Sequence, residues 1–260
     1  MFTQEALAGK HALVCGASQG IGQACARALA RSGARVTLLA RQLDGLERTL
    51  ASLEGSKEAH RAVSCDMSET EQVKSAIQSI GPEVDILVCN SGGPAPGPLH
   101  LADTGALELA FRQHVLAQTL LAQAFIPHMR EKNFGRIINI VSTSVKIPLP
   151  NLGVSNTVRG AVASWAKTLA NELGPHGITV NNILPGYTKT QRLEQIIHNA
   201  MQKTGKSRPE VEQSYLADVP ARRFAEATEI AAACLFLATD SAAYINGINL
   251  PVDGGRTGCL

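Results

Sequence analysis

The stretch His11-Ala12-Leu13-Val14-Cys15-Gly16-Ala17-Ser18-Gln19-Gly20-Ile21-Gly22 decides the fold of this chain. Its first five residues predict a buried strand, and the three glycines that follow open an alanine-rich helix. In such a strand–turn–helix unit, glycines let the backbone approach a pyrophosphate, and the free N–H groups and dipole of the helix favour its charge. The stretch therefore predicts a cradle for the phosphates of a dinucleotide.

Short apolar runs alternate with helical patterns along the rest of the chain. Strands are predicted at 11–15, 35–40, 60–65, 85–90, 136–141, 178–184 and 247–252, and helices at 20–32, 43–54, 68–80, 103–131, 153–173 and 228–238. Ser68, with Glu71 three residues later, predicts a cap for the third helix. Apolar strands that alternate with helices indicate a parallel sheet covered on both faces. We predict an α/β chain with one Rossmann domain over 1–260, a doubly wound, seven-stranded parallel sheet and a ligand crevice at the strands' carboxyl ends.

Composition excludes several classes of partner. With 260 residues and 45% hydrophobic content, the chain can bury one large core, and its net charge of +2 shows no basic cluster that predicts nucleic-acid binding. The six cysteines form no C-x-x-C pair and show no metal-ligand spacing, which favours small buried residues in a reducing compartment. Met1–Lys10 lacks the pattern of a signal peptide, and no run reaches the about 18 apolar residues of a membrane span. We expect no metal, no membrane partner and a cytoplasmic location.

The segment from Tyr187 to Pro220 departs from this alternation. It is polar and charged, yet five apolar residues recur in it at helical spacing: Leu193, Ile196, Ile197, Ala200 and Met201. One interpretation is a surface helix whose apolar stripe packs on the body. The other is a mobile lid over the crevice, formed by 187–218, because long excursions at a ligand face are usually functional. The two interpretations are compatible.

Five ordered motifs resemble those of the short-chain dehydrogenase/reductase family. They are the glycine motif at 16–22, Cys65-Asp66-Met67, Asn90-Ser91-Gly92-Gly93, the stretch 181–186 ending in Pro185-Gly186, and the stretch 246–255 ending in Val252-Asp253-Gly254-Gly255. The resemblance covers essentially the whole chain and is greatest to the 3-oxoacyl-acyl-carrier-protein-reductase-like branch. It implies a nicotinamide cofactor and an oxidoreductase acting on a small carbonyl or alcohol substrate. The implied cofactor-binding residues are Gly16, Ser18, Gln19, Gly20, Ile21, Gly22, Arg41, Asp66, Met67, Asn90, Gly92, Arg159, Pro185, Gly186, Thr188 and Thr190.

The choice of cofactor depends on the end of the second strand. In dinucleotide folds an acidic residue there binds the ribose 2′-hydroxyl, whereas an arginine accommodates the 2′-phosphate of NADP. Here the strand runs into Arg41-Gln42, and the first acid is Asp44. A guanidinium can bind the phosphate by a charge-assisted contact. The sequence therefore favours NADP(H) over NAD(H), with a solvated Arg41 as the alternative.

At the catalytic positions the chain departs from the family. Ser142 matches the serine that binds the substrate carbonyl, but Ser155 stands where the family has tyrosine and Arg159 where it has lysine. His114 aligns with the family's supporting asparagine. An aliphatic hydroxyl is a far poorer proton donor than a phenol near an ammonium, and an arginine stays charged.

Two residues remain as candidate proton donors. The unperturbed pKa of His114 suits acid catalysis near neutrality, unless the ring is only a buried structural group. Tyr187 either swings a phenol into the crevice or packs as loop aromatics usually do. Two functions follow: an NADP(H)-dependent oxidoreductase with an atypical active site, which we favour, or a catalytically silent dinucleotide-binding protein that serves as a redox sensor or a subunit of an assembly.

The long helices predict self-association. One stripe on 153–173 is formed by Ala161, Val162, Trp165, Leu169 and Leu173, and 103–131 is similarly apolar. Relatives in the resembled family pair these two helices into a dimer and then stack dimers through the last strand, which implies a homotetramer. The alternative is that the stripes pack on their own sheet.

Overall fold

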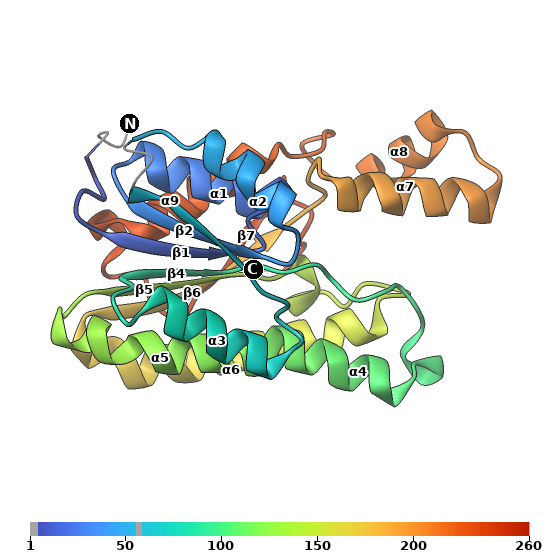
Figure 1. Ribbon diagram of the computed structural model, residues 1–260. Helices are drawn as coiled ribbons and strands as arrows, with labels where there is room; N and C mark the ends of the chain where they lie inside the picture. The colour runs from blue at the N-terminus through green and yellow to red at the C-terminus, as the bar shows by residue number, and fades with distance from the viewer. Residues whose placement is uncertain (1–4, 56–58, 260) are drawn as a thin grey trace.

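A seven-stranded parallel sheet forms the centre of the computed structural model, which describes residues 5–55 and 59–259 (Figure 1). The start of Met1–Lys10 and the last residue of the predicted domain lie outside the described residues. The strands are β1 (His11–Cys15), β2 (Arg35–Ala40), β3 (Arg61–Ser64), β4 (Ile86–Cys89), β5 (Gly135–Ile140), β6 (Ile178–Pro185) and β7 (Asn249–Val252). Their order is β3-β2-β1-β4-β5-β6-β7, so the chain reverses its direction of winding between β1 and β4. The predicted fold and strands are confirmed, and a ligand crevice is expected at this switch point.

Helices cover both faces of the sheet (Figure 1). On one face lie α1 (Gly20–Arg31), α2 (Leu43–Ala51) and α9 (Ala227–Ala238); on the other lie α3 (Thr70–Ile80), α4 (Thr104–Phe111), α5 (Ala117–Glu131) and α6 (Gly153–Leu173). Short 3₁₀ turns occur at Leu99–Leu101, Thr143–Val145, Gly174–His176 and Asp240–Ala242. No helix among the described residues is both long and apolar enough to span a bilayer.

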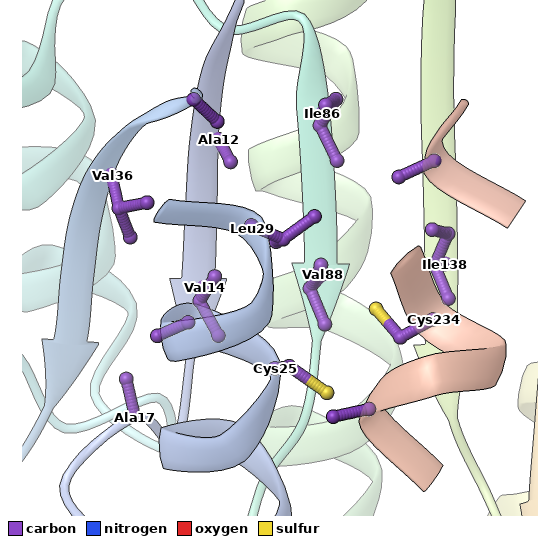
Figure 2. Packing of buried hydrophobic residues seen from close by; sticks show 14 of the residues in the cluster. Ala12, Val14, Ala17, Cys25, Leu29, Val36, Ile86, Val88, Ile138 and Cys234 are labelled. Carbon is purple, nitrogen blue, oxygen red and sulfur yellow. The ribbon is translucent and has the colours of Figure 1, made fainter. Parts of the chain in front are cut away.

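Alternate residues of β1 belong to two different cores. Val14 packs in the cluster under α1 and α9, whereas Leu13 packs in the cluster under α3, α5 and α6. Figure 2 shows the first cluster, in which Cys25 of α1 and Cys234 of α9 lie against the strands. Five of the six cysteines are buried as free thiols, and Cys259 is exposed. A strand that is apolar on both faces thus explains the continuous hydrophobic runs of the sequence.

The predicted helix 103–131 is not uniform. Asp103 accepts a hydrogen bond from the N–H of Ala106 at the start of α4, but a π-helical segment, Arg112–Leu116, separates α4 from α5. This segment carries His114 into the interior. The predicted cap at Ser68 is wrong, because α3 has Glu69 at its N-cap and both the N–H and the hydroxyl of Ser68 donate to Asp66.

The segment after β6 forms two helices, α7 (Gln191–Thr204) and α8 (Arg208–Ala217), which project from the body in Figure 1. Their shared core contains Leu193, Ile197 and Val211, with three aromatic side chains, Tyr187, Tyr215 and Phe224, packed against it. The apolar stripe of α7 therefore packs largely on α8 and this aromatic cluster instead of on the sheet. Movement of the pair as a lid stays a prediction.

Candidate active site

The glycine loop between β1 and α1 requires its glycines. Gly16 and Gly20 have φ of +61° and +59°. A Cβ on Gly16 would lie 2.6 Å from Asn90 Nδ2, and a Cβ on Gly22 would lie 2.2 Å from the Gly16 carbonyl oxygen. The side chain of the N-cap residue of α1, Gln19, makes no capping hydrogen bond with the described residues, so the first N–H groups of the helix are left for another acceptor. The loop packs closely against its neighbours and leaves backbone N–H groups free to donate, which forms a cradle that fits a phosphate anion.

A cleft of about 600 Å³ lies beside this loop, at the carboxyl ends of the strands. Every predicted cofactor-binding residue except Gly22 lines it, and so do Ser142 and Ser155. Asn90 Nδ2 donates to the Gly16 carbonyl at 3.2 Å, which ties the loop to the end of β4. Thr190 caps α7 by accepting from the N–H of Leu193 at 3.4 Å. The fold thus brings residues from widely separated stretches of the sequence to one crevice.

A cation and a carboxylate mark one end of the cleft. The side chain of Arg41 is 70% exposed, and its Nη1 lies 3.7 Å from Asp66 Oδ2. Although burial opposes the shift, hydrogen bonds from Ser68 and the charge of Arg41 lower the pKa of Asp66. The Arg41 guanidinium is therefore free to meet a further anion from the solvent side.

Three polar residues form the other end of the cleft. Ser142 follows β5, and its Oγ accepts from the N–H of Ser144 at 3.1 Å, which leaves its own proton to donate elsewhere. Ser155 and Arg159 are one turn apart on α6 and both line the cleft. Arg159 is 6% exposed; its Nη1 donates to the carbonyl of Ile140 at 3.1 Å, and its Nε is buried without a partner among the described residues. Burial and the charge of Arg192 lower the pKa of Arg159 to about 10, so the guanidinium stays charged at neutral pH.

His114 is fully buried and does not line the cleft. Its Nδ1 lies 2.8 Å from the hydroxyl of Ser91. Burial, with the charge of Arg159, lowers the pKa of His114 to about 3, so the ring is neutral near pH 7. This placement argues against His114 as a proton donor near neutrality. That expectation depended on the unperturbed pKa of histidine, which burial lowers.

Tyr187 lines the cleft but is packed among aromatic rings. Its ring stacks on Tyr215 with centroids 5.1 Å apart and meets Phe224 edge-on at 6.1 Å. Burial raises the pKa of Tyr187 above its usual value, which weakens the phenol as an acid. The packing interpretation of Tyr187 is therefore the one that the geometry favours.

Sequence reasoning missed two arginines of the cleft, Arg192 and Arg256. Arg192 lies in the first turn of α7, and Arg256 directly follows the Gly254-Gly255 turn after β7. The sequence offered one signal for them, namely that both arginines follow glycines of the family motifs. That signal does not predict the direction in which a side chain points. Among the described residues, no group of three or more His, Cys, Asp or Glu side chains is placed to hold a metal ion.

Comparison with known proteins agrees with this geometry. A family model described as enoyl-(acyl carrier protein) reductase matches residues 16–257. The chain belongs to the short-chain dehydrogenase/reductase family. Members of this family are NAD(P)-dependent oxidoreductases of carbonyl and alcohol substrates, and that class applies to this chain.

Individual relatives differ in their substrates. The chain is 33% identical over 249 residues to the NADPH-dependent reductase BacG of Bacillus subtilis, a match that covers 94% of this chain and 96% of BacG. It is 34% identical over 255 residues to D-threitol dehydrogenase of Mycolicibacterium smegmatis, covering 96% and 94%. Among solved structures, L-sorbose reductase from Gluconobacter frateurii, complexed with NADPH and L-sorbose, superimposes with a TM-score of 0.91 at 30% identity, covering 99% of this chain and 100% of that one.

Proposed function

We propose that this chain is an NADP(H)-dependent reductase of activated carbonyl compounds, with Ser142, Ser155 and Arg159 in place of the family's usual catalytic set. The observation that carries the proposal is that these three side chains line the same cleft as the glycine loop and Arg41. A hydride donor bound along the loop would bring its reactive end to this group of side chains.

The cofactor-binding half of the cleft fits NADP(H). The bare N–H groups of the loop and of α1 would hold the pyrophosphate, and Arg41 would hold the 2′-phosphate. β2 runs into Arg41 and Gln42, and Asp44, the first acid after it, is not among the described residues that line the cleft, so no carboxylate there favours NAD(H). When bound, the cofactor supplies a hydride to the carbonyl carbon.

The protein's own contribution is to bind and stabilise the carbonyl oxygen. The hydroxyls of Ser142 and Ser155 are the proposed hydrogen-bond donors to it, and the charge of Arg159 stabilises the negative charge that develops there. Arg159 is suited to this role because its guanidinium is buried and anchored to the carbonyl of Ile140. The group keeps its proton and therefore supplies a fixed positive charge.

A proton donor of near-neutral pKa is absent among the described residues of the cleft. Burial raises the pKa of Cys65 to about 11 and that of Tyr187 above its usual value, while Asp66 has a lowered pKa. Water is then the proposed proton source for the product anion. Because an alkoxide normally receives its proton from an acid in the transition state, the charge of Arg159 is proposed to stabilise the product anion until water protonates it, and an activated carbonyl lowers that demand.

The test is NADPH oxidation across a panel of ketones, β-ketoesters, 3-oxoacyl thioesters and quinones, alongside direct measurement of NADPH binding. The thioesters represent the 3-oxoacyl-acyl-carrier-protein-reductase-like branch. Turnover of an activated carbonyl supports the proposal. Firm NADPH binding with no turnover of any compound would instead favour the silent dinucleotide-binding protein, for which the missing tyrosine is the supporting observation.

A further inference from the structure

The cleft contains more positive charge than its own carboxylates balance. Besides Arg41, three arginines line it: Arg159, Arg192 and Arg256. Asp66 is the sole carboxylate among the described lining residues, and it lies beside Arg41. Within residues 5–55 and 59–259, no carboxylate oxygen comes within 4.0 Å of any of these three guanidinium groups.

Arg192 stands in an unfavourable electrostatic position. It lies in the first turn of α7, where the positive end of the helix dipole favours acidic side chains. The neighbouring acid of that turn, Glu194, is engaged by Arg208 at 2.8 Å. Arg192 Nη2 donates to the carbonyl of Pro94 at 3.0 Å, which holds the guanidinium across the cleft against the loop after β4. An anion bound there would offset both the dipole and the nearby charge of Arg159.

Arg256 also lines the cleft, beside the stretch that contains Ser142. Its guanidinium lies over the ring of Tyr187, 4.5 Å from the centroid, and 3.5 Å from the hydroxyl of Thr143, the residue after Ser142. Its Nε is buried and has no hydrogen-bond partner among the described residues. A buried, unpaired guanidinium nitrogen is costly unless an acceptor meets it in the functional complex.

We propose that the substrate carries an anionic group, a carboxylate or a phosphate, and that Arg192 and Arg256 bind this group beside the reacting carbonyl. The inference rests on the proposed function and narrows its substrate class. The cofactor's own phosphates have other partners, since the glycine loop faces the pyrophosphate and Arg41 the 2′-phosphate. A guanidinium matches the planar fork of a carboxylate and the oxygens of a phosphate, so two arginines that line one cleft without a carboxylate partner are suited to bind an anion.

The kinetic test compares acetoacetate with methyl acetoacetate, and dihydroxyacetone phosphate with dihydroxyacetone. We expect the anion of at least one pair to have the higher kcat/KM. Arg192→Gln or Arg256→Gln should lower kcat/KM for that anion by about 10- to 100-fold, as expected for a lost charge-assisted hydrogen bond, and should lower kcat/KM for its neutral partner far less. The matched control is Arg130→Gln, which removes the same charge from an exposed site on α5 outside the cleft.

A binding measurement separates failure of this inference from failure of the proposed function. In the complex with NADPH, 3-hydroxybutyrate and glycerol 3-phosphate are titrated against methyl 3-hydroxybutyrate and glycerol, with NADPH fluorescence as the signal. Preferential binding of an anion that is lost in Arg192→Gln and Arg256→Gln supports the anion site even if no ketone is turned over, in which case the proposed reductase activity alone fails. Equal binding of anion and neutral partner, binding of neither, or a matching loss of NADPH affinity in both variants overturns the anion site.

Discussion

Restoring the family's proton-donating pair is the sharpest perturbation of this cleft. The double variant Ser155→Tyr/Arg159→Lys replaces a half-buried hydroxyl and a buried guanidinium, one turn apart on α6, by a phenol and an ammonium. A phenol has a pKa near 10, and a nearby ammonium lowers it toward neutrality. The variant should therefore supply the acid that the described residues of the cleft lack.

The expected gain follows from what the present site can and cannot do. In the proposed site Ser142 would provide a hydrogen bond and Arg159 a positive charge, so the missing element is proton transfer. General acid catalysis typically contributes about 10²–10⁴-fold, and we expect kcat/KM for a simple activated ketone to rise by well over tenfold. Ser155→Tyr alone should gain less, because Arg159 cannot relay a proton and its guanidinium is fixed against the carbonyl of Ile140.

The assay is kcat/KM for a β-ketoester with NADPH in the wild type, the single variant and the double variant, with the NADPH dissociation constant measured for each. The matched control is Ser155→Phe/Arg159→Lys, which has the same bulk without the hydroxyl. If the double variant binds NADPH normally and folds, yet reduces ketones no faster than this control, the assignment of positions 155 and 159 to the proton-transfer site is refuted.

Three further outcomes test the remaining assignments. Arg41→Ala should raise the dissociation constant of NADPH about 10- to 100-fold and that of NADH far less, and equal losses in titrations of the two cofactors would count against a 2′-phosphate contact. The pKa of His114 is about 3 in the folded chain and 6.5 when unfolded, so the unfolded state gains the proton first as pH falls. This protonation should lower the free energy of unfolding by about 2 kcal/mol at pH 5. Urea denaturation at pH 7 and pH 5 should show a smaller pH dependence for His114→Asn than for the wild type, and an identical dependence would contradict the buried neutral ring. Light scattering at micromolar concentration should give the mass of a tetramer, since Leu109 and Phe111 leave 48% and 41% of their surface exposed on α4, and a monomer mass would exclude it.

The structure points to a different contact surface for the predicted oligomer than the sequence did. The stripe expected on α6 lies mostly inside the chain's own core, because Val162 and Leu173 are buried and Trp165 and Leu169 are partly buried against the cluster beneath α3, α5 and α6. This is the alternative that the sequence left open. Of the large apolar side chains that remain exposed, Leu109, Phe111 and Leu116 lie together on α4 and the π-helical segment, which makes this surface the better candidate for a subunit contact.

The fold and the glycine loop that lines the cleft were predictable because local signals specify them. Continuous apolar strands report burial on both faces, and the glycine spacing at 16–22 reports a backbone that no Cβ would fit. The π-helical segment at 112–116 was not predictable, because an i→i+5 turn inside an apolar helical pattern has no sequence signature of its own. For the same reason the burial of His114, which decides its pKa, could not be foreseen.

The role of Arg192 and Arg256 could not be predicted for a different reason: they lie far apart in the sequence and line one cleft only in the folded chain. Their placement in the same cleft bears on why an arginine stands at position 159, where the family has lysine. A lysine there would serve as a proton relay, whereas a buried arginine can contribute only a fixed charge. Fixed cations in the cleft stabilise anions without transferring a proton, so the charges that would hold an anionic substrate would also favour the oxyanion formed when its carbonyl is reduced. A site with Ser155 and Arg159 in place of tyrosine and lysine would then stabilise its product anion by charge, where the tyrosine–lysine pair would neutralise it by proton transfer.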